Sequence, residues 1–171
     1  KYEPVLFKRI SKDNSDHIDS YIADGGYLGL KKSLKDMSPA QVIDLVKSSG
    51  LRGRGGAGFP TGLKWTFLPK DHPGPIYLCI NADESEPCTF NNRVLMEKDP
   101  HQVLEGIILT SYAVGASKTF IYVRYEYGDA YRAWHDVVLV IKTFPNPHNT
   151  VAQDLASLQA ADPDYPRVQL I

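Results

Sequence analysis

Apolar and polar positions recur at helical spacing over residues 38–50, which predicts a capped helix there. Ser38 is a good N-cap, Pro39 suits the first helical position, and Gln41 stands where a capping box needs it. Gly50 ends the pattern. A shorter helical pattern over residues 28–34 precedes it. The apolar face of the capped helix consists of Val42, Ile43, Leu45 and Val46.

Two apolar runs on either side of another helical pattern predict a strand, a helix and a strand. Ile76–Ile80 is a short continuous apolar run, typical of a buried strand. Residues 100–116 carry apolar positions at helical spacing, and Thr119–Tyr127 is rich in β-branched and aromatic residues. This order indicates a right-handed parallel crossover. We therefore expect an α/β fold in which an N-terminal helical segment precedes a short parallel sheet, with Cys79 as a small buried hydrophobe.

The pattern is less definite after Tyr127. Residues 133–144 fit either a helix or a strand, residues 145–149 indicate a turn, and residues 151–160 fit a short helix. We expect residues 128–171 to form an irregular tail.

Composition narrows the classes of function. The chain has 171 residues, enough for one domain with its own core, and a net charge of −1, which provides no broad field for nucleic acid. No apolar run reaches the length of a membrane span, so we expect any link to a membrane to go through partners. Cys79 and Cys88 are too few for a disulfide scaffold or a four-ligand metal site. The first residue is Lys1 rather than Met, which fits a processed or trimmed chain, for example one that has lost a transit peptide.

A glycine-dense loop follows the capped helix directly. Gly53–Gly58 matches the G-x-G-x-x-G pattern of dinucleotide sites, but that motif needs a strand before it, and here a helix precedes it. The loop also lacks the G-K-[ST] ending of a P-loop. Arg52 and Arg54 bracket Gly53 and could neutralise a phosphate beside exposed backbone N–H groups. A nucleotide-cofactor loop and a plain structural turn both fit this pattern.

Polar side chains follow the first predicted strand. Asn81, Asp83, Glu84 and Glu86 leave its carboxyl end, where open α/β sheets bind ligands. These side chains can form hydrogen bonds with a flavin, a ribose or a nicotinamide. The alternative is a solvated loop after a strand.

Two motifs carry a resemblance to a known family. Leu51–Trp65, LRGRGGAGFPTGLKW, and Asn81–Pro87, NADESEP, closely resemble the FMN- and NADH-binding flavoprotein 1 subunit of respiratory complex I (NADH:ubiquinone oxidoreductase). The diaphorase subunits of NAD-linked hydrogenases and formate dehydrogenases share its fold. The resemblance runs more loosely from Gly25 to Tyr127. It implies a division into an N-terminal extension with the capped helix (1–50), an FMN/NADH-binding core (51–127) and a divergent tail (128–171).

The resemblance also implies roles for individual residues. Phe59 and Phe67 could otherwise be core aromatics, and Lys64 a solvated helix residue. No catalytic acid or base is implied, because hydride passes directly from nicotinamide to flavin and the protein aligns and tunes the two. The residues implied to contact NADH are Phe59, Phe67 and Glu86. The residues implied to hold FMN are Gly53, Arg54, Gly55, Gly56, Lys64, Asn81, Asp83 and Glu84.

The chain also departs from the family. Cys88 stands where the family has glycine, and Asn91-Asn92-Arg93 stands where it has Lys-Asp-Arg. The family's G-E-E-T segment, its later Asn-Asn pair, and the cysteines that hold a [4Fe–4S] cluster are absent from this sequence. Two functions therefore remain open: a component that binds FMN and NADH for hydride transfer, and a degenerate, non-catalytic accessory subunit of a respiratory complex.

The resemblance implies partners and a location. Electrons that leave a flavin one at a time need an iron–sulfur acceptor, so the expected partners are iron–sulfur subunits of a respiratory or hydrogenase-type complex. We expect the isolated chain to be inactive. The implied location is the matrix side of the mitochondrial inner membrane, or the bacterial cytoplasm peripheral to a membrane, without direct membrane insertion.

Overall fold

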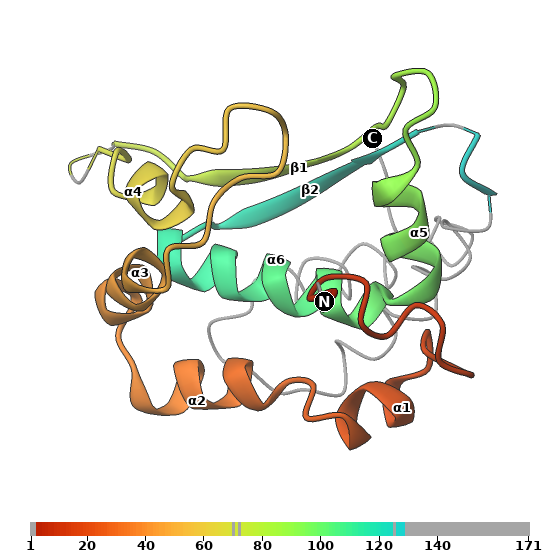
Figure 1. Cartoon of the computed structure of the whole chain (residues 1–171). Helices are drawn as coiled ribbons and strands as arrows, with labels where there is room; N and C mark the ends of the chain where they lie inside the picture. Colours follow the sequence, from red (N-terminus) through yellow and green to blue (C-terminus); the bar gives the residue numbers. More distant parts are fainter. Residues whose placement is uncertain (1–2, 70, 72, 125, 129–171) are drawn as a thin grey trace, which may run out of the picture.

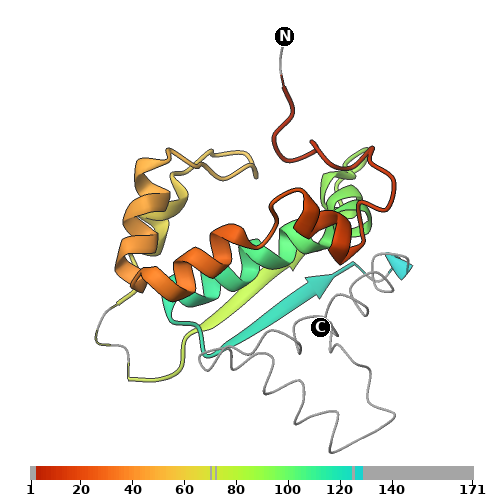
Figure 2. The same cartoon turned by 90° about the horizontal axis from the view of Figure 1, so that it is seen from below.

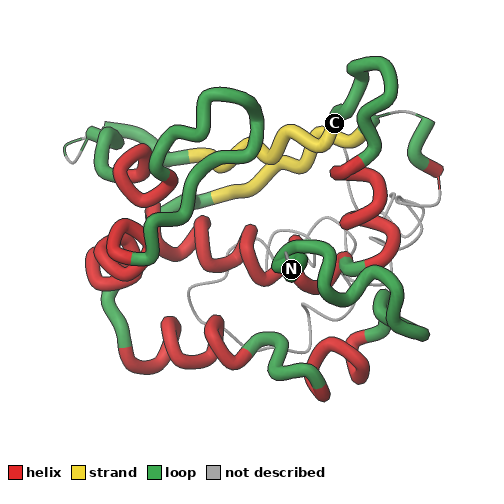
Figure 3. Tube along the Cα trace, viewed as in Figure 1, coloured by secondary structure: helices red, strands yellow, loops and turns green. Residues whose placement is uncertain are grey.

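The computed structural model describes residues 3–69, 71, 73–124 and 126–128. In the described chain four helices precede the first strand, and two more lie between it and the second strand (Figure 1). Figure 3 distinguishes helices and strands from the loops. Predictions for residues 133–144, 145–149 and 151–160 lie outside the described residues. The elements are α1 (Ile18–Ala23), α2 (Leu28–Asp36), α3 (Pro39–Ser48), α4 (Thr61–Trp65), β1 (Tyr77–Ala82), α5 (Asn91–Lys98), α6 (Pro100–Val114) and β2 (Lys118–Val123).

Helix α3 begins with the predicted capping box. The Ser38 hydroxyl accepts a hydrogen bond from the Gln41 backbone N–H at 3.4 Å, and the Gln41 side chain accepts one from the Ser38 N–H at 2.8 Å. Pro39 occupies the first turn, where its missing N–H costs nothing. Val42 is buried. The helix ends at Ser48, and Gly50 follows in the left-handed region with φ of 70°.

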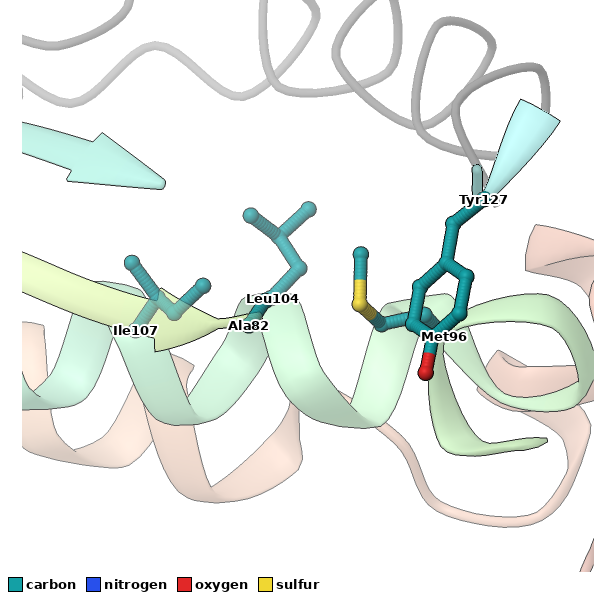
Figure 4. Packing of buried hydrophobic residues seen from close by; sticks show 5 residues of the cluster. All are labelled: Ala82, Met96, Leu104, Ile107 and Tyr127. Carbon is teal, nitrogen blue, oxygen red and sulfur yellow. The ribbon is translucent and has the colours of Figure 1, made fainter. Parts of the chain in front are cut away.

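The two strands pair in parallel, which confirms the predicted α/β fold. The register places Leu78 beside Thr119 and Ile80 beside Ile121, and α5 and α6 make the crossover. The sequence did not indicate α5 as a separate helix. The buried residues between sheet and helices are Ala82, Met96, Leu104, Ile107 and Tyr127 (Figure 4).

Strand β2 is shorter than predicted. The apolar run continued to Tyr127, but the strand ends at Val123. The chain turns there, with the Tyr127 N–H bonded to the Arg124 carbonyl at 3.0 Å. The Tyr127 ring then folds back into the core beside Met96 (Figure 4).

The prediction that Cys79 is buried is wrong. In a strand, successive side chains point to opposite faces, and here only Leu78, Ile80 and Ala82 face α6. Cys79 lies on the other face and is exposed. Its neighbour Tyr77 on that face is 55% exposed.

Helix α6 is the middle layer of the molecule. In Figure 1 the sheet lies above it and α1 and α2 lie below, and in Figure 2 α2 runs alongside it. The Glu105 carboxylate on α6 accepts hydrogen bonds from the Tyr21 hydroxyl at 2.5 Å, the Tyr27 N–H at 2.9 Å and the Leu30 N–H at 3.0 Å. None of the helices in the described part of the chain has the length and apolar character needed to cross a membrane.

Candidate functional site

The glycine loop connects α3 to α4, and its two ends pair with each other. An antiparallel bridge pairs Arg52 with Pro60, and the Gly53 N–H donates to the Phe59 carbonyl at 2.9 Å. The Arg52 guanidinium donates to the Gly58 carbonyl at 3.0 Å. The Arg52 side chain therefore stabilises the base of the loop. Arg54 is also exposed but forms no such hydrogen bond with the described residues.

The tip of this loop is bare backbone. Gly56 and Gly58 have φ of 97° and 59°, which glycine adopts without strain. A Cβ built at Gly55, Gly56 or Gly58 would meet none of the described residues within 4 Å, so packing against them does not explain these glycines. Within the described residues, the backbone N–H groups from Arg54 to Gly58 have no hydrogen-bond partner. Among the described residues, nothing occupies the hydrogen-bond donors that this exposed loop presents.

Helix α4 places a cation and two aromatic rings beside the loop. Gly62 lets α4 approach α3, since a Cβ there would lie 2.6 Å from the Lys47 backbone nitrogen. Lys64 is exposed in the last turn of α4. Phe59 and Phe67 are 44% and 63% exposed, and their ring centroids lie 5.9 Å apart. The alternative that these two rings are core aromatics is therefore wrong.

Strand β1 runs to Ala82, two residues further than predicted, so Asn81 lies within it and the acidic segment follows. The side chains of this region form hydrogen bonds with one another. The Asn81 side-chain oxygen accepts from the Asp83 N–H at 3.0 Å, and the Ser85 hydroxyl donates to the Asp83 carboxylate at 2.7 Å. Asn81 and Glu86 are exposed and Asp83 is half-buried. These three predicted site residues keep polar atoms available to a ligand.

Glu84 differs from its neighbours in this segment. It is only 6% exposed, and its carboxylate accepts the Asn92 N–H at 3.0 Å and the Arg93 N–H at 3.3 Å. Phe90, at the N-cap position of α5, makes no side-chain cap, so Glu84 satisfies these N–H groups at the helix N-terminus. In this structure the Glu84 carboxylate serves the fold. Motif reasoning missed this because the cap comes from outside the helix.

The two loops extend on the same side of the helix layer. In Figure 1 the loop between α3 and α4 and the loop between β1 and α5 both lie above α6, opposite α1 and α2. Cys88 lies in the second loop, exposed and with φ of 66°. A non-glycine residue in this region is uncommon, which explains physically why a glycine suits the position.

Comparison with known proteins decides the family. Residues 46–154 match the Nuo51 FMN-binding domain, more than half of the chain. The chain belongs to the Nuo51 FMN-binding domain family. The match continues past Tyr127, further than the motifs indicated.

Members with assigned functions are similar over most of this chain. A NADH-quinone oxidoreductase F2 subunit from Rhizobium meliloti is 47% identical over 80% of this chain and 32% of its own length. The corresponding F subunit of Aquifex aeolicus is 52% identical over 78% and 31%. A crystal structure of an NAD⁺-reducing [NiFe]-hydrogenase in the air-oxidized state has a TM-score of 0.62 and 32% identity, covering 82% of this chain and 23% of that one.

The chain thus spans about a third of the length of these two oxidoreductase relatives. Both relatives are bacterial, so they do not support the mitochondrial location that the resemblance implied.

Proposed function

We propose that this chain forms the part of a complex I-type NADH dehydrogenase that binds FMN and NADH for hydride transfer. The observation that carries the proposal is the exposed glycine loop, whose backbone N–H groups from Arg54 to Gly58 have no hydrogen-bond partner in the part of the chain that the structure describes. Backbone N–H groups beside a cation suit a phosphate. The residues present therefore fit FMN.

Each group of side chains has a part in this function. Arg54 and the backbone of Gly55 and Gly56 take the FMN phosphate, and Gly53 shapes the base of the loop. Lys64 adds a second cation. Asn81 and Asp83 hold the ribityl chain and the polar edge of the flavin, and Glu84 supports them by capping α5.

Phe59 and Phe67 offer exposed ring faces for stacking with NADH, and Glu86 offers a carboxylate to a ribose hydroxyl. Bound FMN would supply the hydride acceptor and the split into single electrons. The residues of this chain would align the donor beside it and exclude water.

The proposed setting is a multi-subunit complex. The Rhizobium meliloti and Aquifex aeolicus relatives are subunits of NADH-quinone oxidoreductases, and we expect iron–sulfur subunits as the electron acceptors of this chain. Among the described residues no group of His, Cys, Asp and Glu could hold a metal ion. We expect the chain at the cytoplasmic side of a bacterial membrane, held there by partners, and negligible NADH oxidation by the isolated chain.

A second candidate is a non-catalytic accessory subunit with a vestigial site. The strained Cys88 in the acidic loop favours it, because the family has glycine at this position. The visible spectrum of the purified full chain distinguishes the two, since bound flavin absorbs blue light. A colourless chain that does not take up added FMN, yet assembles into a respiratory complex, would support the accessory function.

The assignment of Arg54 is tested by titrating FMN and following the quenching of its fluorescence. Arg54→Ala should weaken binding by about 1.5–3 kcal/mol, the range for a hydrogen bond to a charged group. Riboflavin, which lacks the phosphate, should bind the wild type and this variant equally. Lys35→Ala, an exposed cation on α2, is the control and should leave both affinities unchanged. Equal FMN affinity in Arg54→Ala and wild type would contradict the assignment.

A further inference from the structure

Two side chains that follow β2 form hydrogen bonds with the backbone of the acidic segment. The Arg124 Nη1 donates to the Glu84 carbonyl oxygen at 2.8 Å, and the Tyr127 hydroxyl donates to the same oxygen at 3.2 Å. These donors lie 40 and 43 residues away along the chain. One carbonyl in the middle of the segment is thus fixed by residues that follow the neighbouring strand β2.

The Arg124 guanidinium is itself held in one orientation. Its Nε and Nη2 donate to the two carboxylate oxygens of Glu126, at 2.9 and 3.2 Å. Such a fork leaves the third nitrogen aimed at the Glu84 carbonyl. A lysine has one nitrogen and no fixed plane, so it could keep the charge but not this arrangement.

Glu84 connects these contacts to the rest of the site. Its backbone is held by Arg124 and Tyr127, and its carboxylate caps α5. The Tyr127 ring is anchored in the core beside Met96 (Figure 4). The neighbouring Asn81 and Glu86 remain exposed. The segment is therefore rigid at Glu84 and open on either side of it.

We propose that Arg124 is a positioning residue for cofactor binding. By fixing the Glu84 carbonyl, it sets where Asp83 and Glu86, which follow strand β1, lie relative to the glycine loop, without touching the ligand. This inference rests on the proposed FMN function. Tyr127 supports the same carbonyl through a longer hydrogen bond.

Hydrogen exchange on the full chain without cofactor tests the positioning directly. Arg124→Gln should raise the exchange rate of the backbone amides of residues 83–93 by about tenfold, the equilibrium equivalent of one lost hydrogen bond. Arg124→Lys should raise it to a similar extent, because only the charge is kept. Lys35→Gln carries the same change of charge on α2 and should leave this segment unaffected. Unchanged exchange in Arg124→Gln would overturn the inference.

FMN titration and the reduction potential of the bound flavin complete the test. Both Arg124 variants should bind FMN and riboflavin several-fold more weakly, by the same factor, since the phosphate contacts are untouched. In Arg124→Lys, which keeps the charge, the flavin potential should shift, because the carboxylates of the acidic segment then lie at a different distance from the flavin. A merely structural role would leave the potential unchanged, and that result, like unchanged affinity, would overturn the inference. A wild-type chain that binds no FMN would instead refute the proposed function, while the exchange data would still decide whether Arg124 fixes the segment.

Discussion

Arg9 and Arg54 have the same side chain but opposite surroundings. Arg9 is 9% exposed, and it donates to the carboxylates of Asp24 and Asp99 and to the carbonyls of Ser15 and Ser20. Arg54 is exposed and, within the described residues, has no partner. The first arginine is fully used by the fold, and the second is available to a ligand.

The same division holds for the carboxylates of the two regions. Asp99 and Glu105 face the N-terminal segment and are occupied by its donors, whereas Glu86 is exposed. Buried polar contacts thus stabilise the fold where the N-terminal segment meets α6. On the two loops, Arg54 and Glu86 are exposed and make no hydrogen bond or ion pair with their side chains among the described residues. Binding residues commonly lie on such loops over a rigid scaffold. The contrast shows how a buried polar network can be distinguished from a binding site.

The largest effect should come from exchanging each arginine for methionine. Arg9→Met leaves the fully buried Asp99 without its cation and should destabilise the protein by about 3–5 kcal/mol. Arg54→Met should change the free energy of unfolding by less than about 0.5 kcal/mol. Urea unfolding followed by tryptophan fluorescence measures both. Similar losses of unfolding free energy in the two variants would contradict the contrast drawn between Arg9 and Arg54.

A pH dependence of stability should arise at His101, where α6 meets the N-terminal segment. Burial, and to a smaller extent the nearby Arg9, lower the pKa of His101 from 6.5 to about 4, with Asp16 acting in the opposite direction and His17 in the same one. The Tyr27 hydroxyl lies 2.9 Å from the His101 Nδ1 and suits a neutral ring. Because the folded pKa is below the unfolded one, the unfolded chain binds more protons between these values, and stability is lost as pH falls from about 6.5 to about 4.

We expect this histidine to account for about 2–3 kcal/mol of lost stability across that range. The measurement is the difference in unfolding free energy between wild type and His101→Gln as a function of pH. Subtraction removes shared contributions, such as that of Asp99, whose pKa is raised by burial. The difference should shrink as the solution is acidified. A difference that stays constant with pH would show that His101 is protonated equally in both states.

Local signals in the sequence were enough for much of the fold. Helix α3 and strands β1 and β2 were predicted because their signals lie between neighbours in sequence. These signals are the capping box of Ser38 and Gln41 and the apolar runs near Ile80 and Ile121. The Arg9–Asp99 pair joins residues 90 positions apart, and no local pattern indicates it. The exposure of Cys79 depends on which face of the sheet is covered, which one strand cannot reveal.

The residues of the candidate site were predicted one by one from motifs. In the structure they differ in how exposed their side chains are. Arg54, Lys64, Asn81 and Glu86 are exposed as a ligand would need. Glu84 is buried as a helix cap. The motif could not distinguish them, because a carboxylate that binds a ligand and one that caps a helix have the same letter. The partners of Glu84 come from α5 and the end of β2, so only the tertiary fold reveals its role.

The smallest effect concerns backbone strain in the two regions. Cys88, in the acidic loop, and Asn14, in the N-terminal segment, both have positive φ, 66° and 54°. Left-handed backbone disfavours most side chains by about 1–2 kcal/mol, but asparagine tolerates it through local hydrogen bonds. Cys88→Gly should therefore stabilise the chain by about 1 kcal/mol, and Asn14→Gly by less than half of that. Urea unfolding of the two variants measures the difference, and equal gains would show that the thiol position is not strained.

In the proposed function, Cys88→Gly should also bind FMN at least as tightly as the wild type, because the exposed thiol contributes nothing that a glycine backbone lacks. A weaker affinity would mean that the Cys88 side chain has become part of the site.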